Sequence, residues 1–322
     1  MKKRRLGRTG FEVSEIGFGA WGIGKGLWVG AEDDESLRAL HRAVDLGLNF
    51  IDTALAYGPD HSERLVGRLL RERAERLYVA TKVPPMNREW PARKDVPAVE
   101  VFPRDHIVAC CERSLDNLGV EAIDLLQLHV WRDEWLDQEG WRDALSSLKA
   151  AGKVRHFGIS INDHEPASAL RAVASGVFDA VQVIYNLFDP TPAAELFPAC
   201  RRHDVGVIVR VPLDEGGLTG TIRPDSTFEE GDFRRIYFRG DRAHQVFERA
   251  EKLKASLGQE AATLPELALR FCLSDDAVST VIPGMRRVAT VEANVAVSDG
   301  RRLSPGLLTA LAAHAWPRNF YE

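Results

Sequence analysis

The sequence predicts an α/β protein, a (β/α)8 TIM barrel with an N-terminal hairpin and an extra C-terminal helix, formed as one domain over residues 1–322. Three observations support this fold. Short β-rich runs alternate with stretches of helical period, eight such runs are present, and no interdomain linker interrupts the chain. Strict alternation implies parallel strands with right-handed crossovers, and eight of these units close a barrel, for which about 250 residues is typical.

The eight strand-like runs begin after residue 14. The second, third and fourth read LNFIDTA, RLYVATKV and AIDLLQLHV, in which apolar and β-branched residues dominate before a polar residue near the end. All eight cover residues 15–21, 48–54, 76–83, 122–130, 155–161, 180–188, 206–213 and 278–284.

Between these runs, apolar residues recur every three or four positions, as they do on one face of a helix. In RDHIVACCERSLDNLG, residues Ile107, Cys111, Leu115 and Leu118 follow this spacing, and Gly119 stands where a helix C-cap is expected. Helices are predicted over residues 34–47, 62–73, 104–119 and 263–274.

Two segments lie outside the eight units. The first is KRRLGRTGFEVS, which predicts a small hairpin turned by Arg8, Thr9 and Gly10 and placed to plug the bottom of the barrel. The second is LSPGLLTALAAHAW (303–316), which predicts the extra C-terminal helix.

The composition has the balance of an ordinary soluble protein. Apolar residues make up 45% and charged residues 28%, and the formal charge of −5 argues against nucleic acid or a membrane surface as partner. The N-terminus lacks the apolar run of a signal peptide, and no apolar stretch reaches the roughly 20 residues of a membrane span, so a cytoplasmic location is expected. The oligomeric state is left open.

Cysteine and histidine spacing does not indicate a metal site. The four cysteines show no CxxC spacing, and the nine histidines show no HxH or HExxH motif. We expect the cysteines to be small buried hydrophobic residues.

The ends of three neighbouring strand-like runs carry polar groups that are costly to bury. NFIDTALAYG supplies Asp52 at the end of the second run and Tyr57 in the loop after it, and the next two runs end with Lys82 and His129. Taken singly, Asp52 could cap a helix, Lys82 could extend to the rim, and His129 could be a satisfied core histidine. Recurrence at one level of successive strands favours a site, since barrel enzymes place their chemistry there.

These four groups suit proton donation. An ammonium at Lys82 would stabilise the phenolate of Tyr57 and lower its pKa, and Asp52 would hold Lys82 charged and in place. His129 could donate a hydrogen bond to a substrate oxygen. The set fits protonation of the oxyanion that forms when a hydride reaches a carbonyl.

Segments across nearly the whole chain resemble the aldo-keto reductase family: GFGAWG, NFIDTALAYG, ATKV, DLLQLH, GIS, VQVIYN, RVPLDEGGLTG and VIPGMRR, in this order. The resemblance implies a catalytic tetrad of Asp52, Tyr57, Lys82 and His129. It implies reversible NAD(P)H-dependent reduction of an aldehyde or ketone, with Tyr57 as general acid and without a metal.

The resemblance also implies a nicotinamide site. Ser160, Asn162 and Gln182 would bind the carboxamide, although Asn162 could instead be a buried amide satisfied by backbone. Arg210 stands where many members carry an aromatic ring that stacks on the nicotinamide, and a guanidinium plane can also stack. Ala20, Trp21, Pro212 and Gly284 are further residues expected to bind the cofactor.

The rest of the cofactor is expected to follow strands seven and eight. Leu213, Gly217, Leu218 and Gly220 would lie along the pyrophosphate, where glycines allow close approach of backbone amides. Arg286, followed by Arg287 before a helix start, would bind a 2′-phosphate, which favours NADPH and leaves NADH possible. Thr290 stands where related sequences often have Gln or Arg. Asn294 would contact the adenine.

Two features suggest how a carbonyl or sugar substrate is enclosed. Six of the seven tryptophans fall in or near loops at one barrel mouth; we expect Trp21, Trp90 and Trp131 to line the pocket, and Trp28 and Trp141 to pack loops. Residues 214–241 lack helical period and mix aromatic residues with arginines, which predicts a flap over a phosphorylated cofactor rather than a nucleic-acid surface.

Three alternatives remain at this point. The same tetrad would serve an aldose or sugar dehydrogenase, which runs the reaction in the opposite direction. Lys82 could be the Schiff-base nucleophile of a lyase. Finally, the chain could be a cofactor-binding regulatory subunit with little turnover, like the potassium-channel β subunits of this family.

Overall fold

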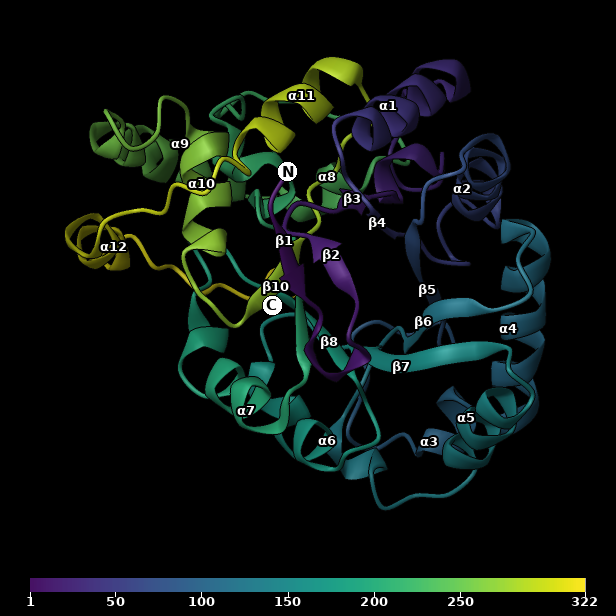
Figure 1. The fold of residues 1–322 in the computed structure, drawn as a ribbon. Coiled ribbons are helices and arrows are strands. Elements are labelled where there is room, and N and C mark those ends of the chain that lie inside the picture. Colours follow the sequence, from purple (N-terminus) through teal and green to yellow (C-terminus); the bar gives the residue numbers. More distant parts are fainter. Residues whose placement is uncertain (322) are drawn as a thin grey trace.

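The computed structural model describes residues 1–321, in which eight parallel strands curl into a barrel surrounded by helices (Figure 1). Each strand pairs with the next along the chain, from β3 to β10. Parallel bridges from Ile16 to Val281 and from Gly19 to Gly284 close the sheet. The barrel strands are β3 (Phe18–Gly19), β4 (Phe50–Asp52), β5 (Tyr78–Val83), β6 (Ile123–Leu128), β7 (Val154–Ser160), β8 (Ala180–Ile184), β9 (Gly206–Arg210) and β10 (Val278–Val281).

The helices form the outer layer, and the four that the sequence predicts are confirmed as α1, α2, α4 and α10. Gly119 adopts the left-handed conformation after α4 and donates its N–H to the Leu115 carbonyl, as a helix C-cap does. The helices are α1 (Asp33–Asp45), α2 (His61–Glu72), α3 (Ala98–Val101), α4 (Arg104–Leu118), α5 (Trp141–Ala150), α6 (Leu170–Ala174), α7 (Leu196–His203), α8 (Phe233–Tyr237), α9 (Arg242–Leu253), α10 (Leu264–Leu273), α11 (Val288–Ala296) and α12 (Pro305–Ala312).

The N-terminal hairpin of β1 (Lys3–Arg5) and β2 (Glu12–Ser14) lies across the barrel opening that faces the viewer in Figure 1. Its fully buried Leu6 joins the inward-facing core residues of the strands, so the expected plug is present. Gly7 is required beside it: its φ is 48°, and a Cβ there would lie 2.2 Å from the Gly206 nitrogen. Arg4 fastens the hairpin by donating to the carbonyl oxygens of Leu273 and Val278, each at 2.6 Å.

Two hydrophobic layers result from the alternation of side chains along the strands. A small inner core fills the lower barrel, and a larger outer core lies between the strands and the helices. The inner core consists of Leu6, Val13, Phe50, Ala80, Leu125, Ala180, Ile208 and Ile282.

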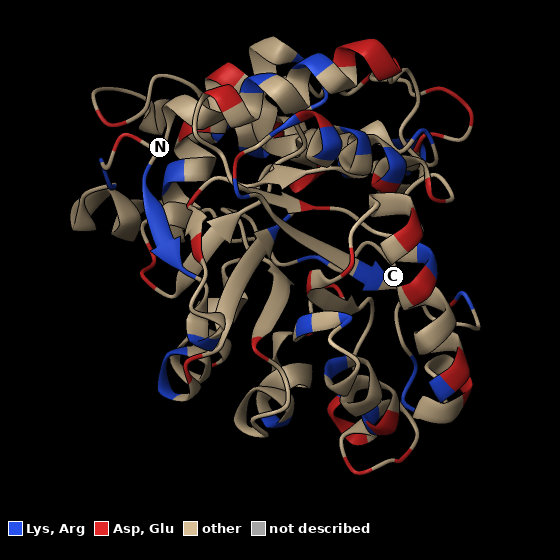
Figure 2. Ribbon diagram, turned by 45° about the vertical axis from the view of Figure 1, so that its right-hand side comes forward, with Lys and Arg blue, Asp and Glu red and all other residues tan. Residues whose placement is uncertain are grey.

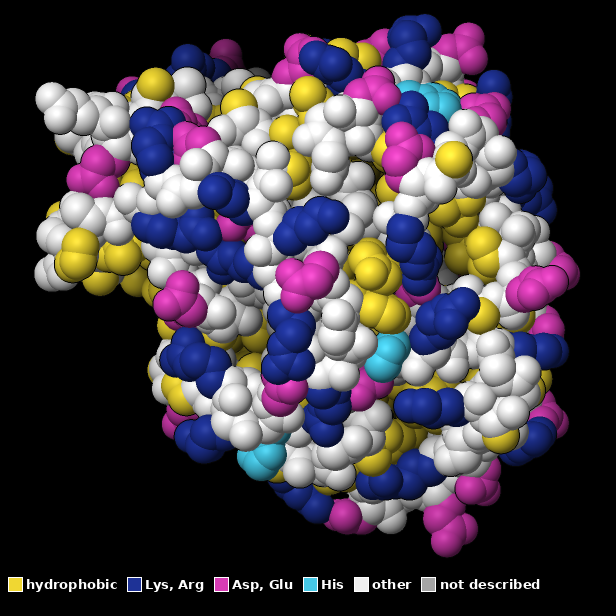
Figure 3. All heavy atoms as spheres, viewed as in Figure 1, with side chains coloured by type: hydrophobic (Ala, Val, Ile, Leu, Met, Phe, Trp, Pro, Cys, Tyr) yellow, Lys and Arg dark blue, Asp and Glu magenta, His cyan; other side chains and the backbone are white. Residues whose placement is uncertain are grey.

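Charged residues are concentrated on the outer helices and loops, whereas the barrel strands are mostly uncharged (Figure 2). On the face that the hairpin covers, basic and acidic side chains are interspersed (Figure 3). No helix within residues 1–321 is both long enough and apolar enough to cross a membrane.

Candidate active site

The four polar residues expected at the strand ends do meet above the inner core. The Lys82 Nζ, fully buried on β5, donates to Asp52 Oδ1 at 2.5 Å, to the Thr53 carbonyl at 2.9 Å and to the Tyr57 hydroxyl at 3.1 Å. The ring of His129, which follows β6, stands edge-on to Tyr57 with centroids 5.8 Å apart. Acid, ammonium, phenol and imidazole therefore form one contiguous group.

Period-two alternation explains this arrangement. Phe50, Ala80 and Leu125 point into the inner core, and two residues later their strands carry Asp52, Lys82 and Gln127. In the same way β8 and β9 carry Gln182 and Arg210 two residues after Ala180 and Ile208. The polar residues thus make the next layer of the barrel, directly above the apolar one.

The loop that carries Tyr57 packs closely against the loop after β3. Gly58 has a φ of 61°, and a Cβ there would lie 1.4 Å from the Gly24 oxygen, so no other residue fits. Ser62 ties the same region together by donating to the Ala20 carbonyl at 2.9 Å. These contacts hold the phenol over the barrel.

The electrostatics of the group differ in one respect from the sequence-based expectation. Burial raises the pKa of Tyr57 and outweighs the opposing effect of Lys82, so the net shift is upward, not downward as predicted. Burial also lowers the pKa of Lys82, but the charges and hydrogen bonds of Asp52 and Tyr57 outweigh it and raise that pKa overall. Tyr57 therefore keeps its proton at pH 7, and Lys82 keeps its charge.

His129 is neutral at pH 7. Burial lowers its pKa well below the usual 6.5, and the positive charges of Lys82 and Arg210 lower it further. Its Nδ1 is buried and has no hydrogen-bond partner among the described residues. A neutral imidazole can still donate one hydrogen bond, which suits the expected contact with a substrate oxygen.

Asp52 is held by two amides that complete its hydrogen bonding. The Nε2 atoms of Gln182 and Gln127 donate to Asp52 Oδ2 at 2.7 and 3.2 Å. Gln127 is not among the site residues expected from the sequence. The spacing in DLLQLH could have identified it, because Gln127 lies two residues before His129 and therefore on the same face of the strand.

A cavity of about 820 Å³ opens above these residues, within the usual size of a small-molecule site. Tyr57 and His129 line it, together with Trp90 and most of the expected cofactor residues. Those that line it are Ala20, Trp21, Ser160, Asn162, Gln182, Arg210, Pro212, Leu213, Gly284 and Arg286.

Four expected cofactor residues do not line this cavity. Gly217 is buried against Asp214, whose Oδ2 would lie 2.4 Å from an added Cβ, and Leu218 is fully buried in the outer core. Gly220 ends a short helical segment in the left-handed conformation. Asn294 is buried on α11, and its Nδ2 finds no partner within the described chain.

The prediction that Trp131 lines the pocket is wrong. Its ring is fully buried in the outer core, 5.2 Å from the ring of Trp141 and 5.0 Å from that of Phe178. Trp135 and Trp141 belong to the same cluster, so these three tryptophans support the helices instead of the mouth. Trp28, expected only to pack loops, does line the cavity.

Asn162 is a buried amide whose hydrogen bonds are made by backbone, which is the alternative to carboxamide binding given for it above. Its Oδ1 accepts from the Ala92 N–H at 2.9 Å and its Nδ2 donates to the Ala92 carbonyl at 3.0 Å, so the amide is occupied by backbone. These bonds hold the loop that carries Trp90, which is 41% exposed at the mouth with its ring edge-on to His129.

The segment expected to be a flap does lie against the cavity. The Phe233 N–H donates to the Leu27 carbonyl at 2.7 Å, and the Tyr237 hydroxyl donates to the buried Asp214 at 2.5 Å. Arg234 stacks on Trp28 and pairs with Asp232 at 2.7 Å. Phe233, Arg234 and Tyr237 therefore contribute directly to the cavity wall.

Positive charge gathers at one end of the cavity. Arg234, Arg286 and Arg287 all line this part of the wall, and after burial the charges of Arg234 and Arg287 lower the pKa of Arg286. Arg286 and Arg287 immediately precede α11 (Val288–Ala296). Such a group of cations at a helix start favours a phosphate.

The residues fit a nicotinamide dinucleotide. The cavity is large enough for one and extends from the tetrad to the arginine group. Beside Gly284 an added Cβ would meet nothing within 4 Å, so this wall is open to a ligand. On α11, which follows Arg286 and Arg287, the buried Asn294 Nδ2 has no hydrogen-bond partner among the described residues, although it does not line the cavity.

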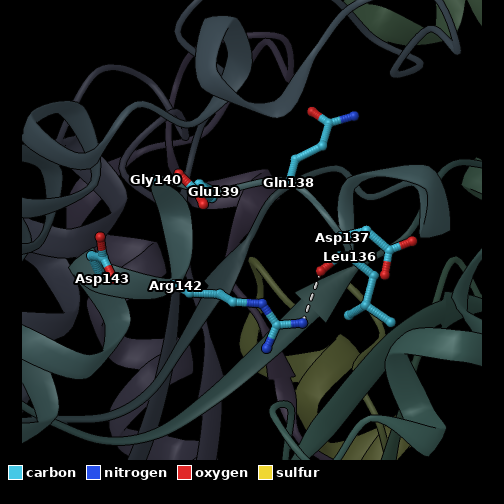
Figure 4. Close-up of a pocket in the computed structure, with 7 residues that line it drawn as sticks. All are labelled: Leu136, Asp137, Gln138, Glu139, Gly140, Arg142 and Asp143. Atoms are coloured by element: carbon cyan, nitrogen blue, oxygen red, sulfur yellow. Dashed lines mark hydrogen bonds between the residues drawn. The ribbon is translucent and has the colours of Figure 1, made fainter.

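A second, shallower hollow of about 450 Å³ lies on one surface loop between Leu136 and Asp143 (Figure 4). Two of its charged groups are already engaged: Arg142 donates to the Leu136 carbonyl at 2.8 Å, and Asp137 pairs with Arg171. No cluster of metal-ligating side chains occurs in the part of the chain that the structure describes. The large cavity is therefore the candidate active site.

Comparison with known proteins agrees with this geometry. A model of the aldo/keto reductase family matches residues 15–314. The aldo-keto reductase YhdN of Bacillus subtilis (strain 168) is 30% identical, over 91% of this chain and 87% of its own length. The NADH-specific methylglyoxal reductase of Escherichia coli (strain K12) is 29% identical, over 92% of this chain and 93% of its own.

A solved structure shares the whole architecture. The glycerol dehydrogenase AKR11B4 from Gluconobacter oxydans aligns with a TM-score of 0.77 and 28% identity, over 97% of this chain and 94% of that one. The chain therefore belongs to the aldo-keto reductase family, and it is an oxidoreductase that uses a nicotinamide cofactor to reduce carbonyl groups.

Proposed function

We propose that this protein reduces an aldehyde or ketone to an alcohol with NADPH, with Tyr57 as the general acid. The observation that carries the proposal is the position of the Lys82 Nζ, 2.5 Å from Asp52 and 3.1 Å from the Tyr57 hydroxyl at the base of the cavity. An ammonium held in this way supports a phenol that must give up its proton.

Each member of the tetrad has a distinct task. The Tyr57 hydroxyl donates its proton to the substrate oxygen as negative charge develops there, and the Lys82 ammonium stabilises the phenolate that remains. Asp52 keeps Lys82 charged, and neutral His129 donates a hydrogen bond to the same substrate oxygen. The bound cofactor supplies the hydride.

The arginine group supports NADPH over NADH. Arg286 and Arg287, with Arg234 from the flap, offer guanidinium groups for the 2′-phosphate that only NADPH carries. Ser160, Gln182 and Arg210 are the residues we assign to the nicotinamide end. NADH remains the alternative, since one relative is named an NADH-specific methylglyoxal reductase.

A sugar or polyol dehydrogenase is the second candidate. The same four residues can catalyse alcohol oxidation, because Tyr57 that has lost its proton is a base. In addition, a solved relative is named a glycerol dehydrogenase. The lyase alternative has less support: Lys82 donates to three oxygen atoms and remains charged, whereas a Schiff-base nucleophile must be neutral.

The test is oxidation of NADPH and NADH with a panel of aromatic aldehydes, short ketones and sugars, for the wild type and Tyr57→Phe. We expect NADPH-dependent turnover that falls at least about a thousandfold in Tyr57→Phe, while NADPH still quenches tryptophan fluorescence in both. Tyr78→Phe, a tyrosine at the opposite end of β5, is the matched control and should retain activity. Turnover that survives in Tyr57→Phe would contradict the assigned acid, and tight binding without turnover would favour a regulatory subunit.

A further inference from the structure

Arg210 places an ion pair in the wall of the cavity. Its guanidinium, at the end of β9, pairs with Asp163 and donates to the Ile161 carbonyl at 2.9 Å. The Arg210 side chain is only 19% exposed, and its Nε has no partner within residues 1–321. Tyr321, near the C-terminus, donates to the other oxygen of Asp163 at 2.9 Å and holds the carboxylate.

The guanidinium belongs to the barrel layer that carries the tetrad: Arg210 follows the inner-core Ile208 by two residues, as Lys82 follows Ala80, and it lines the same cavity as Tyr57 and His129. Besides the larger effects of burial, the Arg210 charge acts on the pKa of both Tyr57 and His129. Asp163 is not among the main influences on either group. The guanidinium is therefore the charge of the pair that acts on the tetrad, while Asp163, in the loop after β7, also lines the cavity.

The position of the Arg210 guanidinium matters because the nicotinamide ring of the cofactor must bind nearby. Under the proposed function, the hydride donor and Tyr57 act on one carbonyl group, so the nicotinamide ring must lie at the tetrad end of the cavity. The oxidised ring carries a positive charge and the reduced ring carries none. A partly buried cation nearby therefore destabilises the oxidised form selectively.

We propose that Arg210, held in place by Asp163, discriminates between the two oxidation states of the cofactor, so that the site binds NADPH more tightly than NADP⁺. The inference rests on the proposed function and names one determinant of it. Product NADP⁺ would leave readily, so that it would inhibit carbonyl reduction only weakly when both nucleotides are present.

The experiment measures dissociation constants of NADPH and NADP⁺ by tryptophan fluorescence, since Trp21 and Trp28 line the cavity. Both nucleotides carry the same phosphates, so the ratio of their dissociation constants isolates the charge on the ring. Arg210→Met should reduce the preference for NADPH roughly three- to tenfold, and Asp163→Asn, which leaves the cation uncompensated, should increase it by a similar factor.

Two further variants separate charge from damage to the fold. The double variant Arg210→Met/Asp163→Asn contains no unpaired charge and should still show a smaller preference for NADPH than the wild type. Arg235→Met removes an exposed cation next to Arg234 and should leave the ratio unchanged. Melting curves show whether each variant is folded.

The outcomes are distinct. If the ratio of the NADP⁺ and NADPH dissociation constants is the same in the wild type and in all variants, the inference about Arg210 is wrong while the proposed function stands. If neither nucleotide binds the folded wild type, the proposed function fails and the inference fails with it. Shifts of this ratio in opposite directions in Arg210→Met and Asp163→Asn would support both the inference and the proposed function.

Discussion

Glu215 is a second acidic side chain in the cavity, outside the tetrad, and its protonation state is unusual. Burial, together with the carboxylates of Asp214 and Asp163, raises its pKa to about 8 against the opposing charges of Arg210 and Arg234. Glu215 is therefore neutral at pH 7. A carboxyl group that stays neutral can share a cavity with the phosphates of a nucleotide without repelling them.

This pKa predicts a pH dependence of cofactor binding. As the pH rises through about 8, Glu215 ionises, and its charge should weaken the binding of NADPH. Fluorescence titrations from pH 6 to 9 should show the dissociation constant rising more steeply for the wild type than for Glu215→Gln, whose amide cannot ionise. Equal slopes for the two proteins would contradict the assignment.

The same shift predicts a change in stability. An acid whose pKa is raised by folding from 4.5 to about 8 is increasingly unfavourable in the folded state as the pH rises between these values. The free energy of unfolding of Glu215→Gln should therefore exceed that of the wild type at pH 8 and approach it near pH 4.5. Urea unfolding at the two pH values measures this difference.

Among the secondary-structure elements, the barrel strands position site residues because their side chains point alternately into and out of the barrel. Gln127 on β6 lies opposite Lys82 in the register of β5 and β6, and so its amide reaches Asp52. Gln127→Leu removes a hydrogen bond to a buried carboxylate but keeps the volume of the side chain. We expect kcat to fall roughly tenfold while the dissociation constant for NADPH changes less than about twofold.

The comparison for Gln127 is Gln182, which also donates to Asp52 but lines the cavity. Gln182→Leu should weaken NADPH binding as well as lower kcat. If both substitutions change only the melting temperature and leave kcat intact, the two amides support the fold and not the chemistry.

The flap acts through α8 and the residues beside it. Arg234 lies against Trp28 and close to Arg286, whereas the next residue, Arg235, is exposed and makes no ion pair within residues 1–321. Arg234→Gln should therefore weaken NADPH binding about tenfold, and Arg235→Gln should change it less than about twofold, as measured by fluorescence titration at low salt. Similar losses in both variants would mean that general positive charge is sufficient.

For the molecule as a whole, the hairpin and the active site occupy opposite ends of one barrel. Leu6 completes the inner core at the bottom, and the polar layer at the top is built on the same strands. Stability and chemistry are thus separated along the barrel axis, as is usual for this fold.

That separation can be tested with Leu6→Ala. The substitution leaves a cavity in the inner core and should cost about 2–5 kcal/mol of the free energy of unfolding, as seen in denaturant melts. KM and the affinity for NADPH should remain unchanged at temperatures where the variant is folded. A change in KM that exceeds the change in stability would show that the bottom of the barrel is coupled to the site.

Local patterns in the sequence predicted the order of elements and the four polar residues that we propose as the tetrad. Helical period, β-rich runs and a polar residue near the end of each strand depend only on neighbours along the chain, so the eight strands and the meeting of Asp52, Tyr57, Lys82 and His129 could be predicted. Gln127 could have been predicted in the same way, because it lies two residues before His129 and points to the same side of the strand.

Only the tertiary structure decided which side chains face the cavity and how charged groups behave there. Trp131 turns into the outer core, where its fully buried ring packs against those of Trp141 and Phe178, and these partners lie 10 and 47 positions away in the sequence. The pKa of Tyr57 rises because burial outweighs the charge of Lys82, and the amount of burial is set by distant parts of the chain. The contact of Tyr321 with Asp163 spans 158 positions, and no local pattern encodes such a pairing.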